Sequence, residues 1–292
     1  MGMAVNTETP LNDGRSRLVG SSFEGMSKWP WWLLIALLGA FYIIFLILTD
    51  EQMQKTFWFI SGQTPQNLSA GTVLFKGITV TLTVAVGAYT LSTIIGLVFG
   101  IMRSSSHPFF YNLASLYVEL IRGIPMLVLL LYVAFALTPI FVNLLNSLGV
   151  PITMREIPNE VRAMVALALG YGAFSAEIFR AGIQSVEYGQ HEAARALGMG
   201  YFQTMRLVVL PQAIRRILPA LGNDFISMVK DSSLVAILGV QDLTQLTRLY
   251  YSGNFLYMQS LTMLAFMYLI LVVLLTRLVR LMEARLHRAY AR

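Results

Sequence analysis

Long apolar runs alternate with short polar segments over most of the chain. The first run, residues 31–49, contains no charged residue. Five further runs follow at about residues 73–102, 113–136, 159–179, 224–240 and 256–279. Each is close to the roughly 20 residues that a helix needs to cross a bilayer core, and backbone in lipid must satisfy its own hydrogen bonds. The pattern predicts an all-α integral membrane protein with about six transmembrane helices.

The run at 224–240 is the least apolar of the six. It contains Asp224, Lys230 and Asp231 ahead of its apolar end. A helix on the membrane surface is the alternative interpretation. The chain would then end on the outside with several arginines, which the distribution of positive charge in membrane proteins disfavours. We therefore interpret this run as a span.

Composition supports lipid as the surrounding solvent. Hydrophobic residues make up 56% of the 292 positions and charged residues only 12%, against about 25% in ordinary globular proteins. The net charge of +6 lies at the edges of the apolar runs, where it suits anionic headgroups and not nucleic acid. The chain has no cysteine and three scattered histidines, which excludes disulfides and thiolate sites and argues against a histidine metal cluster.

Lysine and arginine concentrate in alternate flanks of the runs. The N-terminal tail, the turn after the second run, the loop at 180–223 and the tail at 285–292 hold most of them. The positive-inside rule then places both termini and the 180–223 loop in the cytoplasm. Residues 1–71 are predicted as a cytoplasmic tail, a transmembrane helix and a periplasmic loop, and 72–284 as the main transmembrane domain. A cleaved signal peptide fits poorly because a 30-residue polar lead precedes the first run.

A polar, helix-prone segment separates the fourth and fifth runs. Its apolar residues recur at three- and four-residue spacing, which is typical of an amphipathic helix; they are Ala194, Leu197, Tyr201, Met205 and Val208. Gly198 and Gly200 weaken the middle of such a helix, so we expect two short helices that meet at a bend. Pro211 is expected to end or kink the second one. On this pattern alone, a helix that lies on the membrane surface remains an alternative.

The order of residues in this segment is more specific than its amphipathicity. Glu192-Ala193-Ala194 is followed after three residues by Gly198, after nine more by Val208, and after one more by Leu210-Pro211. This order closely resembles the EAA loop of permease subunits of ATP-binding-cassette (ABC) importers, with Val208 at the usual isoleucine position. The similarity covers roughly residues 72–284, and 117–132, 171–199 and 210–243 resemble the polar amino-acid branch.

The resemblance implies a fold and a role for the loop. The last five helices would form a type I ABC-importer permease fold, with the run at 31–49 as an additional helix. The loop would be a coupling helix that docks on a cytoplasmic ATPase subunit, and the implied coupling residues are Glu192, Ala193, Ala194, Arg195, Gly198, Arg206, Leu210 and Pro211. Gly198 would permit the bend and Glu192 would lock the loop by polar contacts. Arg195 and Arg206 would contact the ATPase, or alternatively anchor in lipid headgroups.

The resemblance also implies partners. The sequence contains no G-x-x-x-x-G-K-[ST] phosphate-binding loop, so we expect no ATPase activity in this chain. ATP hydrolysis would occur on separate ATPase subunits that hold ATP and Mg, and no cofactor is expected here. The other expected partners are a second permease, identical or related, a periplasmic amino-acid-binding protein, the amino-acid substrate and membrane lipid.

Charged residues inside the runs are costly in lipid and indicate structural or functional roles. Glu119 and Arg122, and likewise Glu177 and Arg180, are three residues apart, and this spacing predicts two structural ion pairs. Lys230 and Asp231 are adjacent and therefore about 100° apart on a helix, so they cannot pair with each other. We predict a substrate pathway lined by Asn223, Ser227, Lys230, Asp231 and Ser232.

Together these features predict a permease subunit in the bacterial inner membrane that carries polar or charged amino acids and has no catalysis of its own. An ion-coupled secondary transporter is the alternative, but such proteins normally show paired inverted repeats, which the sequence does not display. An intramembrane enzyme would need paired catalytic carboxylates or histidine clusters within the runs, and the sequence has neither.

Overall fold

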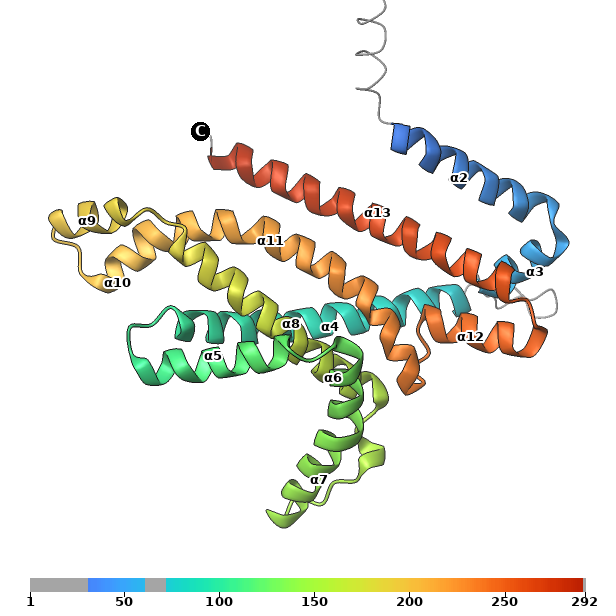
Figure 1. Cartoon of the computed structure of the whole chain (residues 1–292), viewed down its shortest axis with the longest axis horizontal. Helices are drawn as coiled ribbons and strands as arrows, with labels where there is room; N and C mark the ends of the chain where they lie inside the picture. Colours follow the sequence, from blue (N-terminus) through green and yellow to red (C-terminus); the bar gives the residue numbers. More distant parts are fainter. Residues whose placement is uncertain (1–30, 61–71, 291–292) are drawn as a thin grey trace, which may run out of the picture. The chain divides into compact units, whose positions relative to one another are not determined.

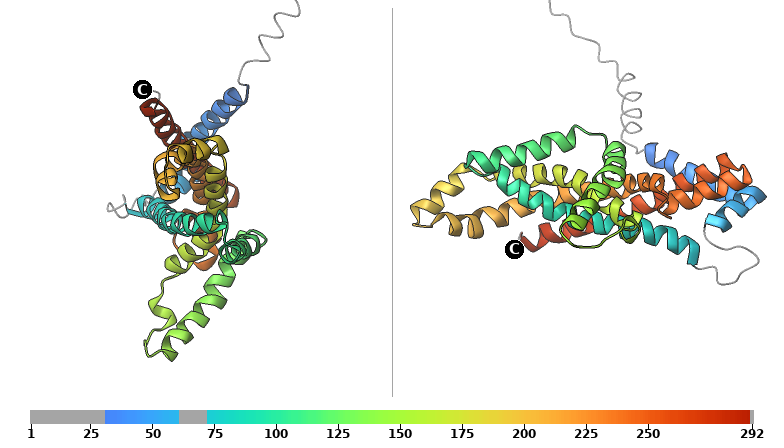
Figure 2. Two further views of the ribbon diagram at one scale, coloured as in Figure 1. Left: turned by 90° about the vertical axis from the view of Figure 1, so that its left-hand side faces the viewer. Right: turned by 90° about the horizontal axis from the view of Figure 1, so that it is seen from below.

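The computed structural model describes residues 31–60 and 72–290, and its regular structure is helical throughout these two ranges (Figures 1 and 2). The predicted all-α fold is therefore confirmed. The chain divides into two units after Thr49, and the described part of the first unit is α2 (Trp31–Thr49). The predicted cytoplasmic tail at 1–30 lies outside the described residues, as does 61–71 of the predicted periplasmic loop.

The second unit begins at Asp50 and contains the remaining described helices. In chain order they are α3 (Glu51–Ile60), α4 (Thr72–Arg103), α5 (Pro108–Arg122), α6 (Met126–Tyr132), α7 (Thr138–Ser147), α8 (Asn159–Gln184), α9 (Tyr188–Ala196), α10 (Tyr201–Thr204), α11 (Leu210–Asp231), α12 (Leu243–Asn254) and α13 (Tyr257–Tyr290). Two π-helical segments, η1 (Val133–Leu137) and η3 (Met205–Val209), and two 3-10 segments, η2 (Met154–Glu156) and η4 (Ser232–Leu238), connect or extend them.

The centre of the second unit is the contact between α4 and α8, which lie side by side in Figure 1. Small residues allow the two backbones to approach closely, as is common where helices pack in membranes. A Cβ atom on Gly96 would overlap Ser175, and one on Gly100 would lie 2.8 Å from the carbonyl oxygen of Ala176. α11 packs on α8 and on α13, so the α4–α8 pair fixes the positions of the helices that flank the loop.

Four helices of the described chain are long and apolar enough to cross a membrane: Lys76–Arg103, Met126–Ser147, Asn159–Gln184 and Tyr257–Arg285. α2 and α3 add a fifth if they count as one broken span. Three of these helices coincide with the predicted spans at 73–102, 159–179 and 256–279. The number of spans in the whole chain stays a prediction.

The boundaries of two predicted spans are corrected by the structure. The run at 113–136 is not one helix, because α5 ends at Arg122 and a new helix begins at Met126. Pro125, at the N-cap of α6, has no backbone N–H and disfavours a helical residue before it. The run at 224–240 is also broken. α11 ends at Asp231, and the following 3-10 segment ends at Leu238 with Gly239, which has a φ of +76°, as its C-cap.

The end of the second unit opposite the loop is built by α12 with parts of α3, α4 and α13. Asp242 is fully buried and caps α12, since its carboxylate accepts a hydrogen bond from the Gln245 backbone N–H at 2.8 Å. Burial raises the pKa of this carboxyl to about 6. α3 joins the same end through Gln52, which accepts a hydrogen bond from Gln259 at 2.8 Å.

Candidate functional site

The loop at 180–223 is a helical hairpin at the common end of α8 and α11 (Figure 1). α9 ends at Ala196, and the chain reverses at Gly198, whose φ of +80° is the left-handed conformation that glycine adopts without strain. The Gly198 and Met199 N–H groups donate to the carbonyls of Arg195 and Ala194 at 2.9 and 3.1 Å, which closes the helix end. The bend expected at Gly198 is therefore present in the structure.

Of the two predicted effects of Pro211, the end of the second helix is not present, and a kink stays a prediction. α10, the π-helical segment η3 and α11 form one continuous helical stretch, and Pro211 lies in the first turn of α11. A proline ring inside an α-helix clashes with the carbonyl four residues earlier. The wider turn of a π-helical segment directly before Pro211 is a common way to accommodate such an irregularity.

The base of the hairpin is held by an apolar cluster and by polar contacts. Its buried members are Val186, Val209, Ala213 and Ile217. Gly182 permits this packing, since a Cβ atom there would overlap Ile217. Arg216 donates to the Ser185 carbonyl, and Gln212 donates to the Gln190 side chain at 3.3 Å. These contacts tie the two arms together, so that the hairpin can move as one body with α8 and α11.

The tip of the hairpin exposes large apolar side chains. Leu197 is 82% exposed, and Tyr201 and Phe202 beyond the turn are exposed to a similar degree. Ala194 faces the opposite way and is buried. The predicted single apolar stripe is therefore split, because the reversal at Gly198 turns Leu197 and Tyr201 outward. Exposed apolar side chains with a charged rim are typical of a surface for a protein partner.

The charged coupling residues form the rim of this tip. Glu192, Arg195 and Arg206 are exposed, as are Ala193 and Pro211, while Leu210 is half-buried. Glu192 forms no side-chain hydrogen bond or ion pair with any described residue, so it does not lock the hairpin as predicted. Gln190 and Arg216 provide the polar ties between the arms instead.

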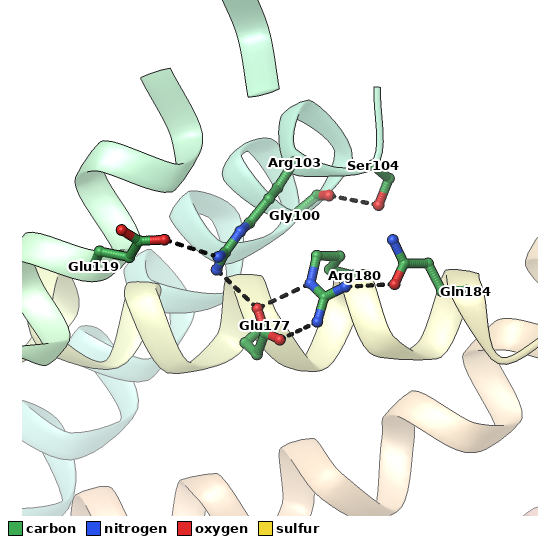
Figure 3. A network of polar contacts seen from close by, with 7 residues as sticks. All are labelled: Gly100, Arg103, Ser104, Glu119, Glu177, Arg180 and Gln184. Carbon is green, nitrogen blue, oxygen red and sulfur yellow. Dashed lines mark hydrogen bonds and ion pairs between the residues drawn. The ribbon is translucent and has the colours of Figure 1, made fainter. Parts of the chain in front are cut away.

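An ion network joins α4, α5 and α8 near the hairpin (Figure 3). Glu177 accepts hydrogen bonds from Arg103 Nη1 and Arg180 Nε, both at 3.0 Å, so the predicted Glu177–Arg180 pair is present. The predicted Glu119–Arg122 pair does not form. Glu119 lies 3.4 Å from Arg103, and the Arg122 guanidinium lies over the Phe174 ring, 5.4 Å from its centroid. Arg122 is the last residue of α5, and this position brings it to the aromatic face of α8.

A second polar cluster lies where α11 faces α8. Asp231 accepts a hydrogen bond from the Tyr171 hydroxyl at 2.8 Å, and Asp224 accepts one from Ser175 at 3.2 Å. Tyr171 and Ser175 are four residues apart and the two aspartates seven apart, so each pair shares one helix face. Neither carboxylate has an ion-pair partner among the residues that the structure describes. We call these four residues the acidic stripe.

The other predicted pathway residues lie around the acidic stripe in different environments. Asn223 and Lys230 are exposed, and Ser227 is half-buried. Ser232 is fully buried and donates to the Val229 carbonyl at 2.7 Å, and its place in the pathway stays a prediction. Sequence reasoning missed Asp224, Tyr171 and Ser175 as site residues. The available signal was that Tyr171 and Ser175, and likewise Asp224 and Asp231, recur at spacings that share one helix face.

These features define a multi-pass membrane protein with a rigid projecting hairpin and a polar contact between two central helices. Residues 92–288 match the family model described as "Binding-protein-dependent transport system inner membrane component". The chain therefore belongs to this family, the membrane subunits of ABC transporters that work with a binding protein.

Individual relatives agree with the family assignment. The chain is 33% identical over 223 residues to "Probable amino-acid permease protein YxeN" of Bacillus subtilis, covering 76% of this chain and 95% of that protein. It is also 33% identical over 214 residues to "Glutamine transport system permease protein GlnP" of Escherichia coli, covering 73% and 93%.

Solved structures show the same fold. A crystal structure of an amino acid ABC transporter with histidines matches with a TM-score of 0.62 and 38% identity, covering 72% of this chain and 92% of that chain. The MetNI methionine ABC transporter matches at 24% identity with a TM-score of 0.56, covering 74% and 95%, which supports the fold alone. The second unit thus has the type I ABC-importer permease fold that the EAA order predicts.

Proposed function

We propose that this chain is the permease subunit of an ABC importer that carries polar or charged amino acids across the inner membrane. The observation that carries the proposal is the exposed, rigid hairpin at 180–223, in the EAA order, on a permease fold. The relatives described as amino-acid permeases support the substrate class. ATP hydrolysis, with its ATP and Mg, belongs to a separate subunit.

The tip of the hairpin is the surface that we assign to the ATPase. Leu197, Tyr201 and Phe202 provide apolar area that no described residue covers, and apolar and aromatic side chains commonly anchor protein interfaces. Arg195 and Arg206 stand exposed at its rim, where charges steer association more than they add affinity. Motion of the ATPase would then pass through the tied arms into α8 and α11.

The acidic stripe is the part of the pathway that we assign to the substrate. Every amino acid carries an ammonium group, and Asp224 and Asp231 offer two carboxylates without a cationic partner in the described chain. Tyr171 and Ser175 orient these carboxylates by donating to one oxygen of each. A periplasmic binding protein would deliver the amino acid, and a second permease, identical or related, would complete the pathway.

The function is tested by reconstitution into liposomes. Uptake of a radiolabelled amino acid is expected only when the chain is reconstituted with its ATPase, with ATP inside and the binding protein outside. Liposomes with this chain alone and a proton or sodium gradient are expected to show no uptake above protein-free liposomes. Gradient-driven uptake by the chain alone would instead establish the secondary transporter.

We further propose that both termini and the hairpin face the cytoplasm. Arginines cluster at the C-terminal end of α13, which Figure 1 shows towards the hairpin end of α8 and α11. Positive residues favour the cytoplasmic side. A green fluorescent protein fused after Arg292, which matures in the cytoplasm and not after export, is expected to fluoresce. A dark but membrane-inserted fusion, together with active alkaline phosphatase at the same point, would reverse this orientation.

A further inference from the structure

A cavity of about 470 Å³ lies between the segment 133–141 and the first half of α8. Its walls are almost wholly apolar and include Val133, Leu137, Phe141, Val161, Val165 and Leu169. Arg162 is the one charged residue that lines it. The volume lies within the range of about 300–1,000 Å³ that is usual for small-molecule sites. The cavity is separate from the acidic stripe and from the hairpin.

Arg162 has fewer hydrogen-bond and ion-pair partners than a cation in apolar surroundings normally has. One terminal nitrogen donates to the Met154 carbonyl. Its Nε atom is buried and has no hydrogen-bond partner, and Arg162 forms no ion pair within the described ranges. Charged groups removed from water are usually paired or hydrogen-bonded. The guanidinium at this cavity therefore lacks an anion.

The position of Arg162 along α8 indicates which anion could reach it. Arg162 lies in the first turn of α8, at the end of that span opposite the hairpin. The helix spans 159–184, so this first turn lies near the level of lipid headgroups. The cavity extends from Arg162 along α8 to Leu169, two turns deeper into the span. The charged group of the cavity, Arg162, thus lies at the edge of the membrane, and the apolar part of the cavity lies deeper in the span.

The π-helical segment η1 contributes to the shape of the cavity. Val133 and Leu137, the first and last residues of η1, both line it. The Val133 carbonyl accepts hydrogen bonds from both the backbone N–H and the hydroxyl of Thr138, the latter at 2.7 Å. Single π-helical turns occur frequently at functional sites. Thr138 also lines the cavity, and its hydroxyl is bonded within the turn.

We propose that this cavity binds an anionic phospholipid. Its phosphate pairs with Arg162, and an acyl chain lies along Val133, Leu137 and Val165. A transported amino acid fits the site less well, because its ammonium group would find no carboxylate among the lining residues. Arginine recognises phosphate by paired, charge-assisted hydrogen bonds.

The test uses photo-cross-linking in the assembled transporter. The complex is placed in nanodiscs of phosphatidylcholine with a trace of phosphatidylglycerol that carries a photoreactive acyl chain. Mass spectrometry is expected to locate the cross-link in 133–141 or 161–169. Arg162→Gln is expected to reduce the cross-link about tenfold, as for loss of a charge-assisted hydrogen bond, and Arg162→Lys to retain most of it. Val165→Phe, which fills the cavity and leaves Arg162 in place, is expected to abolish it.

Two controls make the result decisive. Arg155→Gln removes an exposed arginine from the same external connection and is expected to leave the cross-link unchanged. The melting temperature of each variant in phosphatidylcholine alone shows whether it is folded. Equal cross-linking in Arg162→Gln, or equal cross-linking by photoreactive phosphatidylcholine, would overturn the proposal. Cross-linking of the cavity residues to the second permease in place of the lipid would also overturn it.

Discussion

Gly198→Asp is expected to abolish coupled transport while the permease still folds and inserts into the membrane. In the chain itself the substitution meets no obstacle, because nothing lies within 4 Å of a Cβ atom at Gly198. The left-handed backbone at φ +80° adds about 1–2 kcal/mol for a residue other than glycine. Under the proposed docking, however, the aspartate brings a charge into the apolar part of the interface. Such an uncompensated charge costs about 3–5 kcal/mol, or at least about a 100-fold weaker association with the ATPase.

The measurement is uptake together with binding-protein-stimulated ATP hydrolysis in the reconstituted complex. Gly149→Asp is the matched control, since Gly149 also has a positive φ, +84°, and open space around it, but lies in the connection after α7. Its transport is expected to stay near that of the unmodified protein. Glu192→Ala is expected to have a milder effect than Gly198→Asp, because Glu192 has no partner within the described chain. Wild-type uptake and ATP hydrolysis in Gly198→Asp would show that the hairpin does not couple the two subunits.

The hairpin illustrates what sequence order can predict. The bend at Gly198 followed from the glycine and from the EAA order, and the structure places a left-handed residue there. The directions of the side chains could not be predicted from this order. Leu197 and Ala194 are three residues apart and were assigned to one apolar face, but the reversal between the helices separates them. Periodicity describes a continuous helix and does not apply across such a reversal.

The transmembrane helices show a second limit. Hydropathy located α4, α8 and α13, because their apolar runs are uninterrupted. It misplaced the helix around Pro125, since hydropathy averages over a window and does not detect a single residue that breaks the helix. It also treated 224–240 as one span, although the helical segment starts far upstream and ends at Asp231. The polar residues in that run make it the least apolar of the six, so hydropathy gave the weakest support for a span there.

The partners of the charged residues depend on tertiary contacts, which a single sequence does not show. Glu177 and Arg180 pair as their spacing predicts, because both lie within one uninterrupted helix. Glu119 and Arg122 have the same spacing, yet Arg103 from another helix takes the carboxylate. Local spacing makes a pair possible, and the neighbouring helix decides whether it forms. Asp231 needed a partner from another helix for the same reason, and Tyr171 provides it.

The acidic stripe leads to the second large expected effect. Asp231→Asn is expected to reduce amino-acid uptake about 10- to 100-fold and to leave the fold intact. The asparagine side-chain oxygen can still accept the Tyr171 hydrogen bond that the carboxylate now accepts at 2.8 Å, so local packing is preserved. Only the negative charge is lost, and with it a charge-assisted contact to the substrate ammonium of about 1.5–3 kcal/mol. Asp224→Asn is expected to act in the same direction, since Ser175 can still donate to it.

The comparison variants separate charge from structure. Tyr171→Phe keeps both carboxylates and removes only the hydroxyl that orients Asp231, so its uptake is expected to fall less than that of Asp231→Asn. Asp242→Asn neutralises another buried carboxylate, which caps α12 and lies 3.5 Å from a tyrosine hydroxyl outside the acidic stripe, and is expected to retain uptake. Melting temperature and basal ATP hydrolysis of the assembled complex report on folding and docking. If Asp231→Asn and Asp224→Asn both transported at the unmodified rate in an intact complex, the acidic stripe would be a structural contact between α8 and α11, and the amino acid would have to cross elsewhere.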